Sequence, residues 1–273
     1  MKTILIASVL LLFWGCSSDY EEGTIQSAPT LSKAEPAQTT VQVAIFKADD
    51  YGASPDSGMT PGWQTFINYI RGRGIKASMG VIGLGILRGN QQFLDSTKVF
   101  SESPMFEFWD HGYEHIVNQL DSNGNLYSEF KGTDFRYQKS HLKLTQQLLR
   151  TKIGITLKGF GAPGNATDSV TKSLMETKPF GLRYWFFGDT TAQNIFVFKD
   201  EVSAESETGV PSFQKFLETY DPSLPYIVLQ IHPKNFDAAD YVEVNLIVDY
   251  LLNLGVEFVL PTEYMKGIGA AGV

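Results

Sequence analysis

Two adjacent carboxylates and three histidines stand where the sequence predicts that strands end. They are Asp49, Asp50, His111, His115 and His232. Imidazole and carboxylate groups ligate catalytic zinc, and the same groups accept and donate protons during hydrolysis. Because neighbouring carboxylates repel each other, a cation is expected opposite the aspartate pair. These residue types therefore suggest a metal ion that activates water beside a general acid and a general base.

The spacing within "HGYEH" supports a shared ligand role for His111 and His115. If this segment begins a helical turn, residues four apart place both rings on one face. Two imidazoles and one carboxylate, with a position left for water, form a catalytic zinc arrangement. One aspartate of the pair could bind the ion while the other accepts a proton. The alternative for "DDYG" is a turn with an Asx cap, and His141 is expected on a helix surface or in packing.

The elements that must position these residues follow from hydrophobic periodicity. Strands are predicted over residues 41–48, 75–83, 104–110, 157–163, 182–187, 194–198, 225–232 and 256–261. Helices are predicted over residues 61–74, 133–154, 167–178, 210–221 and 238–255. This alternation predicts a (β/α) barrel or an open parallel sheet. In either fold, residues at the carboxyl ends of the strands gather in one place.

Four segments, "KADDYG", "HGYEH", "FGAPGN" and "LQIHP", resemble in order and spacing the motifs of a known family. They are similar to those of the metal-dependent polysaccharide deacetylases, carbohydrate esterase family four, over roughly residues 41–262. The resemblance implies a distorted (β/α) barrel with a divalent metal, expected to be Zn²⁺. It also implies an acetylated poly- or oligosaccharide substrate from which N- or O-acetyl groups are removed.

The resemblance also implies a role for each motif residue. Asp49 would be the general base and His232 the general acid, and the metal ligands would be Asp50, His111 and His115. A backbone N–H of the loop formed by Pro163, Gly164 and Asn165 would hold the oxyanion. Aromatic residues near the motifs could stack on a sugar ring or belong to the core; they are Tyr51, Trp109, Tyr113 and Trp185.

Two charge partners are left open by the sequence. The family usually has an arginine in the third motif that pairs with the base, but Gly161 stands at that position. The candidate replacements are Lys47, Arg183 and Lys234. A protonated His232 needs a carboxylate neighbour, for which the candidates are Asp189 and Asp237.

The N-terminal segment predicts export. Residues 1–16, "MKTILIASVLLLFWGC", resemble a bacterial lipoprotein signal in which Cys16 is lipidated, and the alternative is an ordinary signal peptide with an incidental cysteine. Cys16 is the single cysteine of the chain, so no internal disulfide can form. Residues 17–40 are expected to be a flexible linker, and residues 41–273 the catalytic domain. The expected location is the periplasm or the cell surface, with a lipid anchor in a bacterial membrane.

Composition and retained residues narrow the functional alternatives. A net charge of −8 and the lack of a basic patch argue against nucleic acid as a partner. Two alternatives to a deacetylase stay open. One is a metal-dependent hydrolase of another C–N or ester bond on the same fold, and the other is a non-catalytic carbohydrate-binding lipoprotein. Asp49 and His232 argue against the second, because a metal site alone needs neither residue.

Overall fold

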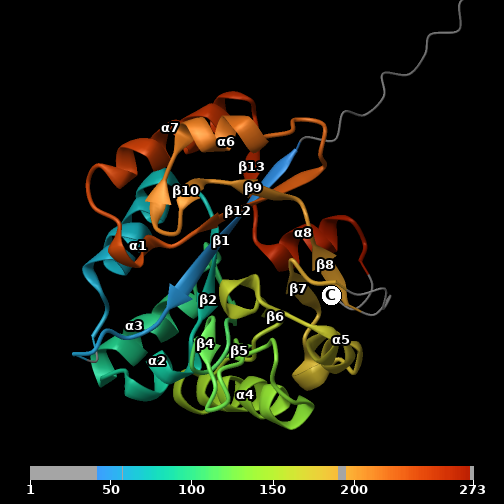
Figure 1. Ribbon diagram of the computed structural model, residues 1–273. Coiled ribbons are helices and arrows are strands. Elements are labelled where there is room, and N and C mark those ends of the chain that lie inside the picture. The colour runs from blue at the N-terminus through green and yellow to red at the C-terminus, as the bar shows by residue number, and fades with distance from the viewer. Residues whose placement is uncertain (1–41, 57, 190–194, 271–273) are drawn as a thin grey trace, which may run out of the picture. The chain divides into compact units, whose positions relative to one another are not determined.

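A parallel sheet that curves into a nearly closed barrel forms the centre of the protein (Figure 1). The computed structural model describes residues 42–270, except residue 57 and residues 190–194. Its main strands follow the order β8-β7-β6-β3-β2-β1-β12-β9, and each neighbouring pair is parallel. β8 and β9, at the two ends of this order, are consecutive in the chain. The predicted (β/α) barrel is therefore confirmed.

The strands of this sheet agree closely with the predicted apolar runs. They are β1 (Val43–Tyr51), β2 (Ala77–Val81), β3 (Phe106–Asp110), β6 (Gly159–Phe160), β7 (Tyr184–Phe186), β8 (Phe196–Phe198), β9 (Glu201–Ser203), β12 (Tyr226–Ile231) and β13 (Glu257–Phe258), which pairs with the start of β1. Two small antiparallel pairs lie outside it, β4 (Gln119–Leu120) with β5 (Leu126–Tyr127) and β10 (Glu205–Glu207) with β11 (Val210–Pro211). β9 and both small pairs were not among the predicted strands.

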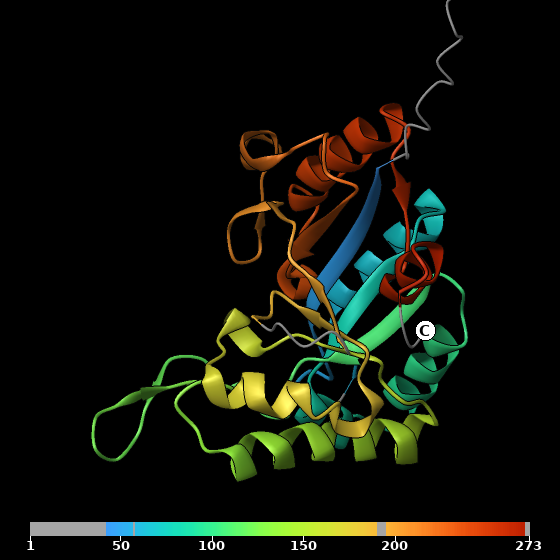
Figure 2. The same cartoon turned by 90° about the vertical axis from the view of Figure 1, so that its right-hand side faces the viewer.

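Helices flank the outer face of the sheet (Figures 1 and 2). They are α1 (Pro61–Arg73), α2 (Gly83–Arg88), α3 (Gln91–Ser101), α4 (Phe135–Leu148), α5 (Ser169–Glu176), α6 (Phe213–Thr219), α7 (Asp240–Asn253) and α8 (Pro261–Gly267). α4 continues into the π-helical turn η1 (Leu149–Ile153), and the short 3-10 turns are η2 (Pro163–Asn165), η3 (Pro179–Gly181) and η4 (Pro233–Asn235). The five predicted helices are present, and α2, α3 and α8 are additional. None of the described helices is long and apolar enough to cross a membrane.

Strand alternation divides the core into an outer and an inner part. Ala44, Phe46 and Ala48 of β1 belong to an apolar cluster that includes residues of α1, α3 and α7. Ile45 belongs instead to a cluster that includes Trp109 and side chains of β7, β8 and β12. Because successive side chains of a strand point to opposite faces, every second residue of β1 faces the barrel interior.

Candidate metal centre and catalytic site

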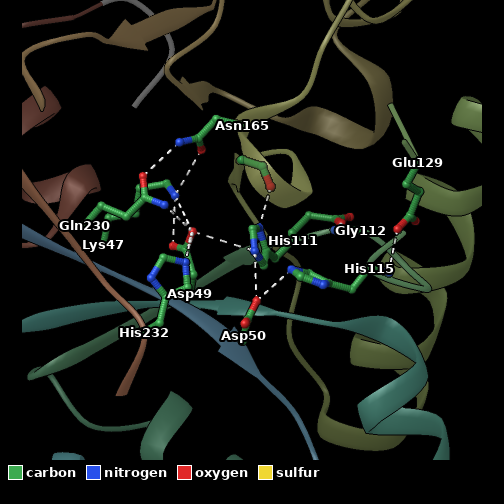
Figure 3. Close-up of polar contacts among 12 residues, drawn as sticks. Lys47, Asp49, Asp50, His111, Gly112, His115, Glu129, Asn165, Gln230 and His232 are labelled. Atoms are coloured by element: carbon green, nitrogen blue, oxygen red, sulfur yellow. Dashed lines mark hydrogen bonds and ion pairs between the residues drawn. The ribbon is translucent and has the colours of Figure 1, made fainter. Parts of the chain in front are cut away.

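Three strands bring the predicted catalytic residues to one end of the barrel interior. On β1, Lys47 and Asp49 continue the inward face that begins at Ile45, and Gln230 precedes His232 by two residues at the end of β12. His111 follows β3 directly, two residues after the inward-facing Trp109. The two-residue period of a strand thus places a residue of each motif on the same face. The side chains converge in the view of Figure 3.

Asp50 reaches the same place because β1 is bulged. The register of β1 against β2 shifts between Ala48 and Tyr51, and Asp50 has a φ of 72°. A bulge of this kind re-aims a side chain that would otherwise point to the opposite face from its neighbour. The indole of Trp63 donates to the Asp50 carbonyl at 3.1 Å, which holds the bulge from the α1 side. Asp49 and Asp50 can therefore both serve one site.

The segment "HGYEH" is an irregular loop, so the expected helical turn is wrong. Its backbone has positive φ values at Gly112 (79°) and His115 (60°), which a right-handed helix excludes. The rings of His111 and His115 nevertheless lie 5.1 Å apart between centroids. The loop conformation, and not an i,i+4 helical face, brings the two imidazoles together.

The three predicted ligands meet at one point (Figure 3). Asp50 Oδ1 lies 3.3 Å from His111 Nε2 and 2.8 Å from His115 Nε2, and the three ligand atoms all lie within 4.8 Å of one another. Burial alone would raise the pKa of Asp50, but its contacts with His111 and His115 outweigh burial and hold the pKa well below the usual range. Asp50 is therefore ionised at neutral pH.

These donors fit a divalent metal ion. Asp50 Oδ1 and His111 Nε2 are both buried without a hydrogen-bond partner. His111 Nδ1 lies 2.7 Å from the carbonyl oxygen of Gly161, which can only accept, so Nδ1 carries a proton. In the neutral ring, Nε2 then presents its lone pair to the Asp50 carboxylate. Two lone pairs that face each other need a cation between them, and two imidazoles with a carboxylate are a zinc donor set.

Lys47 supplies the positive charge for Asp49. Its Nζ lies 2.8 Å and 2.6 Å from the two carboxylate oxygens, and the side chains are 0% and 1% exposed. Gln230 donates to Asp49 Oδ2 at 3.1 Å, and Asn165 donates to Gln230 Oε1 at 2.9 Å. Of the three candidates for the missing arginine, Lys47 therefore pairs with Asp49, whereas Arg183 and Lys234 do not contact it.

Gly161 has no room for a side chain, which explains why the charge comes from elsewhere. A Cβ at this position would lie 2.7 Å from the ring of Trp109. Trp109 fills the space between the strands, with Lys47 Nζ 5.0 Å from its ring centroid and the His111 ring 5.0 Å away edge-on. A cation over an indole face gains a further electrostatic attraction. Trp109 thus supports the lysine and one metal ligand together.

The expectation that Tyr51 and Trp109 line a sugar groove is wrong. Both are 0% exposed, so neither can contact a polysaccharide. Tyr51 packs against Trp63 and Phe93 in the core, and its hydroxyl lies 2.8 Å from Thr97 Oγ1. Trp185 is buried as well, and Tyr113 is half-buried with its ring edge-on to His141. The aromatic residues near the motifs thus mainly build the scaffold.

His232 is paired with Glu205, a residue that sequence reasoning missed. Its Nδ1 lies 2.7 Å from Glu205 Oε2, and its backbone N–H donates to Oε1 at 2.7 Å. Asp189 and Asp237, the expected candidates, do not take this place. Glu205 lies 27 residues before His232 on the short strand β10, and no spacing rule points to it. Burial would lower the pKa of His232, but the Glu205 hydrogen bond and the nearby Asp49 raise it.

The loop after β6 offers one candidate oxyanion donor. Pro163 has no N–H, and the N–H of Asn165 donates to the Ala162 carbonyl at 2.9 Å. Gly164 has a φ of 59° at the centre of the turn. Within this turn, the amide of Gly164 is therefore the candidate donor.

Two cavities open beside the site. The first has a volume of about 300 Å³ and is lined by Asp50 and His115 together with Leu84, Arg88 and Lys234 among others. The second has a volume of about 160 Å³ and is lined by Gln230 and His232 with Glu201 and Glu205 among others. In Figure 3, His115 and His232 lie on opposite sides of Asp50; His115 lines the first cavity and His232 lines the second.

Solved structures with this fold include carbohydrate esterases and pseudoenzymes. A family 4 acetyl xylan esterase from Clostridium thermocellum, solved with a cobalt ion, is 15% identical, with a TM-score of 0.59 over 84% of this chain and 93% of the other. The Xyl-CE4 domain of a multidomain xylanase from the hindgut metagenome of Trinervitermes trinervoides is 17% identical, with a TM-score of 0.56 and coverages of 85% and 93%. A CE4 family pseudoenzyme from Bacillus anthracis is 11% identical, with a TM-score of 0.57 and coverages of 82% and 65%.

The likeness at these identities is one of fold. No protein-family model matches the sequence, and no curated protein matches it. The chain has the barrel fold of the CE4 carbohydrate esterases, and the fold occurs with and without activity. Whether this chain is active therefore depends on its own residues at the site.

Removing the partner of Asp49 should destabilise the protein strongly. Lys47→Met leaves a buried carboxylate without its cation, which typically costs about 3–5 kcal/mol of unfolding free energy. The matched control is Lys98→Met, because Lys98 pairs with Glu102 on the surface and an exposed pair is worth about 1 kcal/mol or less. Urea unfolding of both variants measures the difference. Equal losses of unfolding free energy in the two variants would show that the Lys47–Asp49 pair contributes no more to stability than an exposed ion pair.

Glu205→Gln should lower the pKa of His232. The neutral amide no longer stabilises the imidazolium, and loss of an adjacent opposite charge typically shifts a pKa by about 1 unit or more. NMR titration of the His232 ring in both proteins measures the shift directly. Because the pKa is raised on folding, the pair stabilises the protein below the unfolded value of about 6.5, and this contribution is lost as pH rises through the folded value. An unchanged ring titration would contradict the assigned pairing.

Proposed function

We propose that the protein is a metal-dependent hydrolase that removes acetyl groups from a carbohydrate. The observation that carries this proposal is the convergence of Asp50, His111 and His115 beside a second carboxylate, Asp49, that has its own buried cation. A structural metal site needs no separately balanced carboxylate and no raised-pKa histidine at its edge. A hydrolytic site needs both, as general base and general acid.

Asp50, His111 and His115 would hold the ion, and Zn²⁺ is the proposed metal because the donors are two nitrogens and one oxygen. A divalent ion bound there would acidify water and polarise the acetyl carbonyl. The proposed substrate is an acetylated glycan. Two features support it: carbohydrate esterases have the same fold, and cavities on both sides of the ligands suit an extended chain of sugars.

Asp49 Oδ2 would accept the proton from water. It lies 3.7 Å from His111 Nε2 on one side and 3.7 Å from His232 Nε2 on the other. Lys47 contacts both carboxylate oxygens and Gln230 donates to Oδ2, so the orientation of the carboxylate is already fixed before any reaction. The base therefore stands between the ligand set and the acid.

His232 would complete the reaction as general acid. Glu205 orients the ring through Nδ1, which leaves Nε2 to face the site. Its raised pKa keeps the ring protonated closer to neutral pH than an isolated histidine. The Nε2 proton would pass to the leaving amine or alcohol oxygen, while the Gly164 amide would donate to the oxyanion.

Acetate release from acetylated oligosaccharides, measured alongside metal content, tests this function. Asp49→Asn should keep the metal and lose turnover by roughly 10²- to 10⁴-fold, because a general base contributes about that factor. His111→Ala should lose the metal and with it the activity. Near-full activity of Asp49→Asn would refute the base assignment. Bound metal without acetate from N- or O-acetylated glycans would favour a hydrolase of another C–N or ester bond.

We also propose that the protein is exported and that a lipid on Cys16 anchors it to a bacterial membrane. Cys16 lies outside the described residues. Two hydrophobic signals are usually needed for stable anchoring, and bacterial-type lipidation would supply several chains at one residue. In a bacterial host, Cys16→Ser should therefore move the protein from the membrane fraction to the soluble fraction. A wild-type protein that is already soluble after export would overturn the anchor.

A further inference from the structure

The "HGYEH" loop wraps around a buried carboxylate that the proposed chemistry does not use. Glu129 is 0% exposed and accepts hydrogen bonds from three successive backbone N–H groups of the loop. These donors belong to Tyr113, Glu114 (3.2 Å) and His115 (2.7 Å). Successive amides that point at one anion form a nest, a concave site for negative charge. The anion in this nest is a side chain of the chain itself (Figure 3).

The rest of the surroundings also serve this carboxylate. His141 Nδ1 lies 2.9 Å from Glu129 Oε1, and the ring is buried between the rings of Tyr137 and Tyr113. A Cβ at position 112 would lie 2.7 Å from Glu129 Oε2, so only Gly112 lets the loop close over the carboxylate. The Glu129 backbone N–H donates to the Ile116 carbonyl at 2.8 Å, which ties the same residue to the loop twice. His141 is thus a partner of this carboxylate and not a surface histidine.

The nest bears directly on a proposed metal ligand. His115 has a φ of 60°, a conformation that costs a residue with a side chain about 1–2 kcal/mol. Its own N–H is held by Glu129 Oε2, while its ring Nε2 lies 2.8 Å from Asp50 Oδ1. The hydrogen bond to Glu129 therefore offsets the strain at the residue whose side chain must reach the ion.

We infer that Glu129 is a positioning residue that sets His115 as a metal ligand by serving as the anion around which the "HGYEH" loop folds. This inference rests on the proposed function in so far as His115 ligates a metal. Glu129 itself would touch neither the ion nor the substrate. Its role would be to fix the backbone of His115, and removing it would weaken metal affinity, since residues that orient a ligand typically contribute roughly 10- to 100-fold.

The test is metal affinity in the absence of substrate. In the wild-type protein, both carboxylate oxygens of Glu129 accept hydrogen bonds from backbone N–H groups. Glu129→Gln keeps the size of the side chain but replaces one of these acceptors by an NH₂ donor, so one side of the nest loses its acceptor. Titration of the metal-free full chain with Co²⁺ should give a Kd raised roughly 10- to 100-fold and an altered visible absorption spectrum. Glu129→Asp keeps the charge, but its shorter side chain places the carboxylate farther from the loop amides. This variant should also have a higher Kd for Co²⁺ than the wild type.

Glu107→Gln is the matched control. Glu107 is a half-buried carboxylate that also accepts three hydrogen bonds, from the Tyr184 hydroxyl and from the amide and hydroxyl of Thr262. It lies at the other end of strand β3 from the loop. This variant should lose stability while its Co²⁺ affinity and spectrum stay unchanged.

Each outcome bears either on the metal site or on the role of Glu129. If wild-type protein binds no Co²⁺, the proposed metal function fails and this inference falls with it. If wild type binds and Glu129→Gln and Glu129→Asp bind equally well with an unchanged spectrum, the positioning role is overturned while the metal site stands. If Glu107→Gln weakens binding as much as Glu129→Gln, the effect is a general loss of stability and the positioning role is likewise overturned.

Discussion

The constraint on which this site depends is the placement of two adjacent carboxylates at the buried end of one strand. Asp49 is fully buried and Asp50 is half-buried, so the two charges would repel each other in surroundings that screen them weakly. The fold resolves this by turning the two carboxylates in different directions, one to a cation and the other to a pair of imidazoles. Lys47 pairs with Asp49 from the same inward face of β1, and the bulge turns Asp50 to the two histidines that follow β3. Without the bulge, Asp50 would point to the opposite face of the strand and could not reach the histidines.

The buried lysine has consequences for its neighbours. The aliphatic part of a buried lysine side chain needs apolar neighbours, and its ammonium group needs a favourable electrostatic contact. Trp109 provides such a contact, because its ring centroid lies 5.0 Å from Lys47 Nζ. That indole in turn leaves no room for side chains at two positions: a Cβ at Gly80 would lie 2.3 Å from its ring and one at Gly161 would lie 2.7 Å away. Position 161 thus has no room for an arginine, and the cation that pairs with Asp49 comes from β1 instead.

How far the sequence predicts this structure depends on the range of the interactions. The inward faces of β1 and β12 could be read from a period of two, and the strand ends then place Asp49 and His232 together, so the fold and the meeting of the motifs were predictable. The spacing of His111 and His115 suggested a helix, but four-residue spacing also fits a loop whose shape is set by Glu129, 14 residues further on. Glu205 was missed for the same reason. Tyr51 and Trp109 were misplaced because residue type alone does not tell a core aromatic from one that faces a substrate.

The charges at the site suggest why a divalent ion suits it better than a proton. Lys47 balances Asp49, and Glu205 balances a protonated His232, so each pair is close to neutral. His111 is a neutral donor when its Nδ1 proton goes to the Gly161 carbonyl. If His115 is neutral as well, as a metal ligand must be, Asp50 contributes the single uncompensated negative charge among these residues. A proton there would only cancel it. A divalent ion would leave one net positive charge facing the cavity, in surroundings that screen it weakly, where a developing oxyanion is stabilised most strongly. The internal pairing of the other two carboxylates would therefore keep them from competing for the ion and leave its charge available to the substrate.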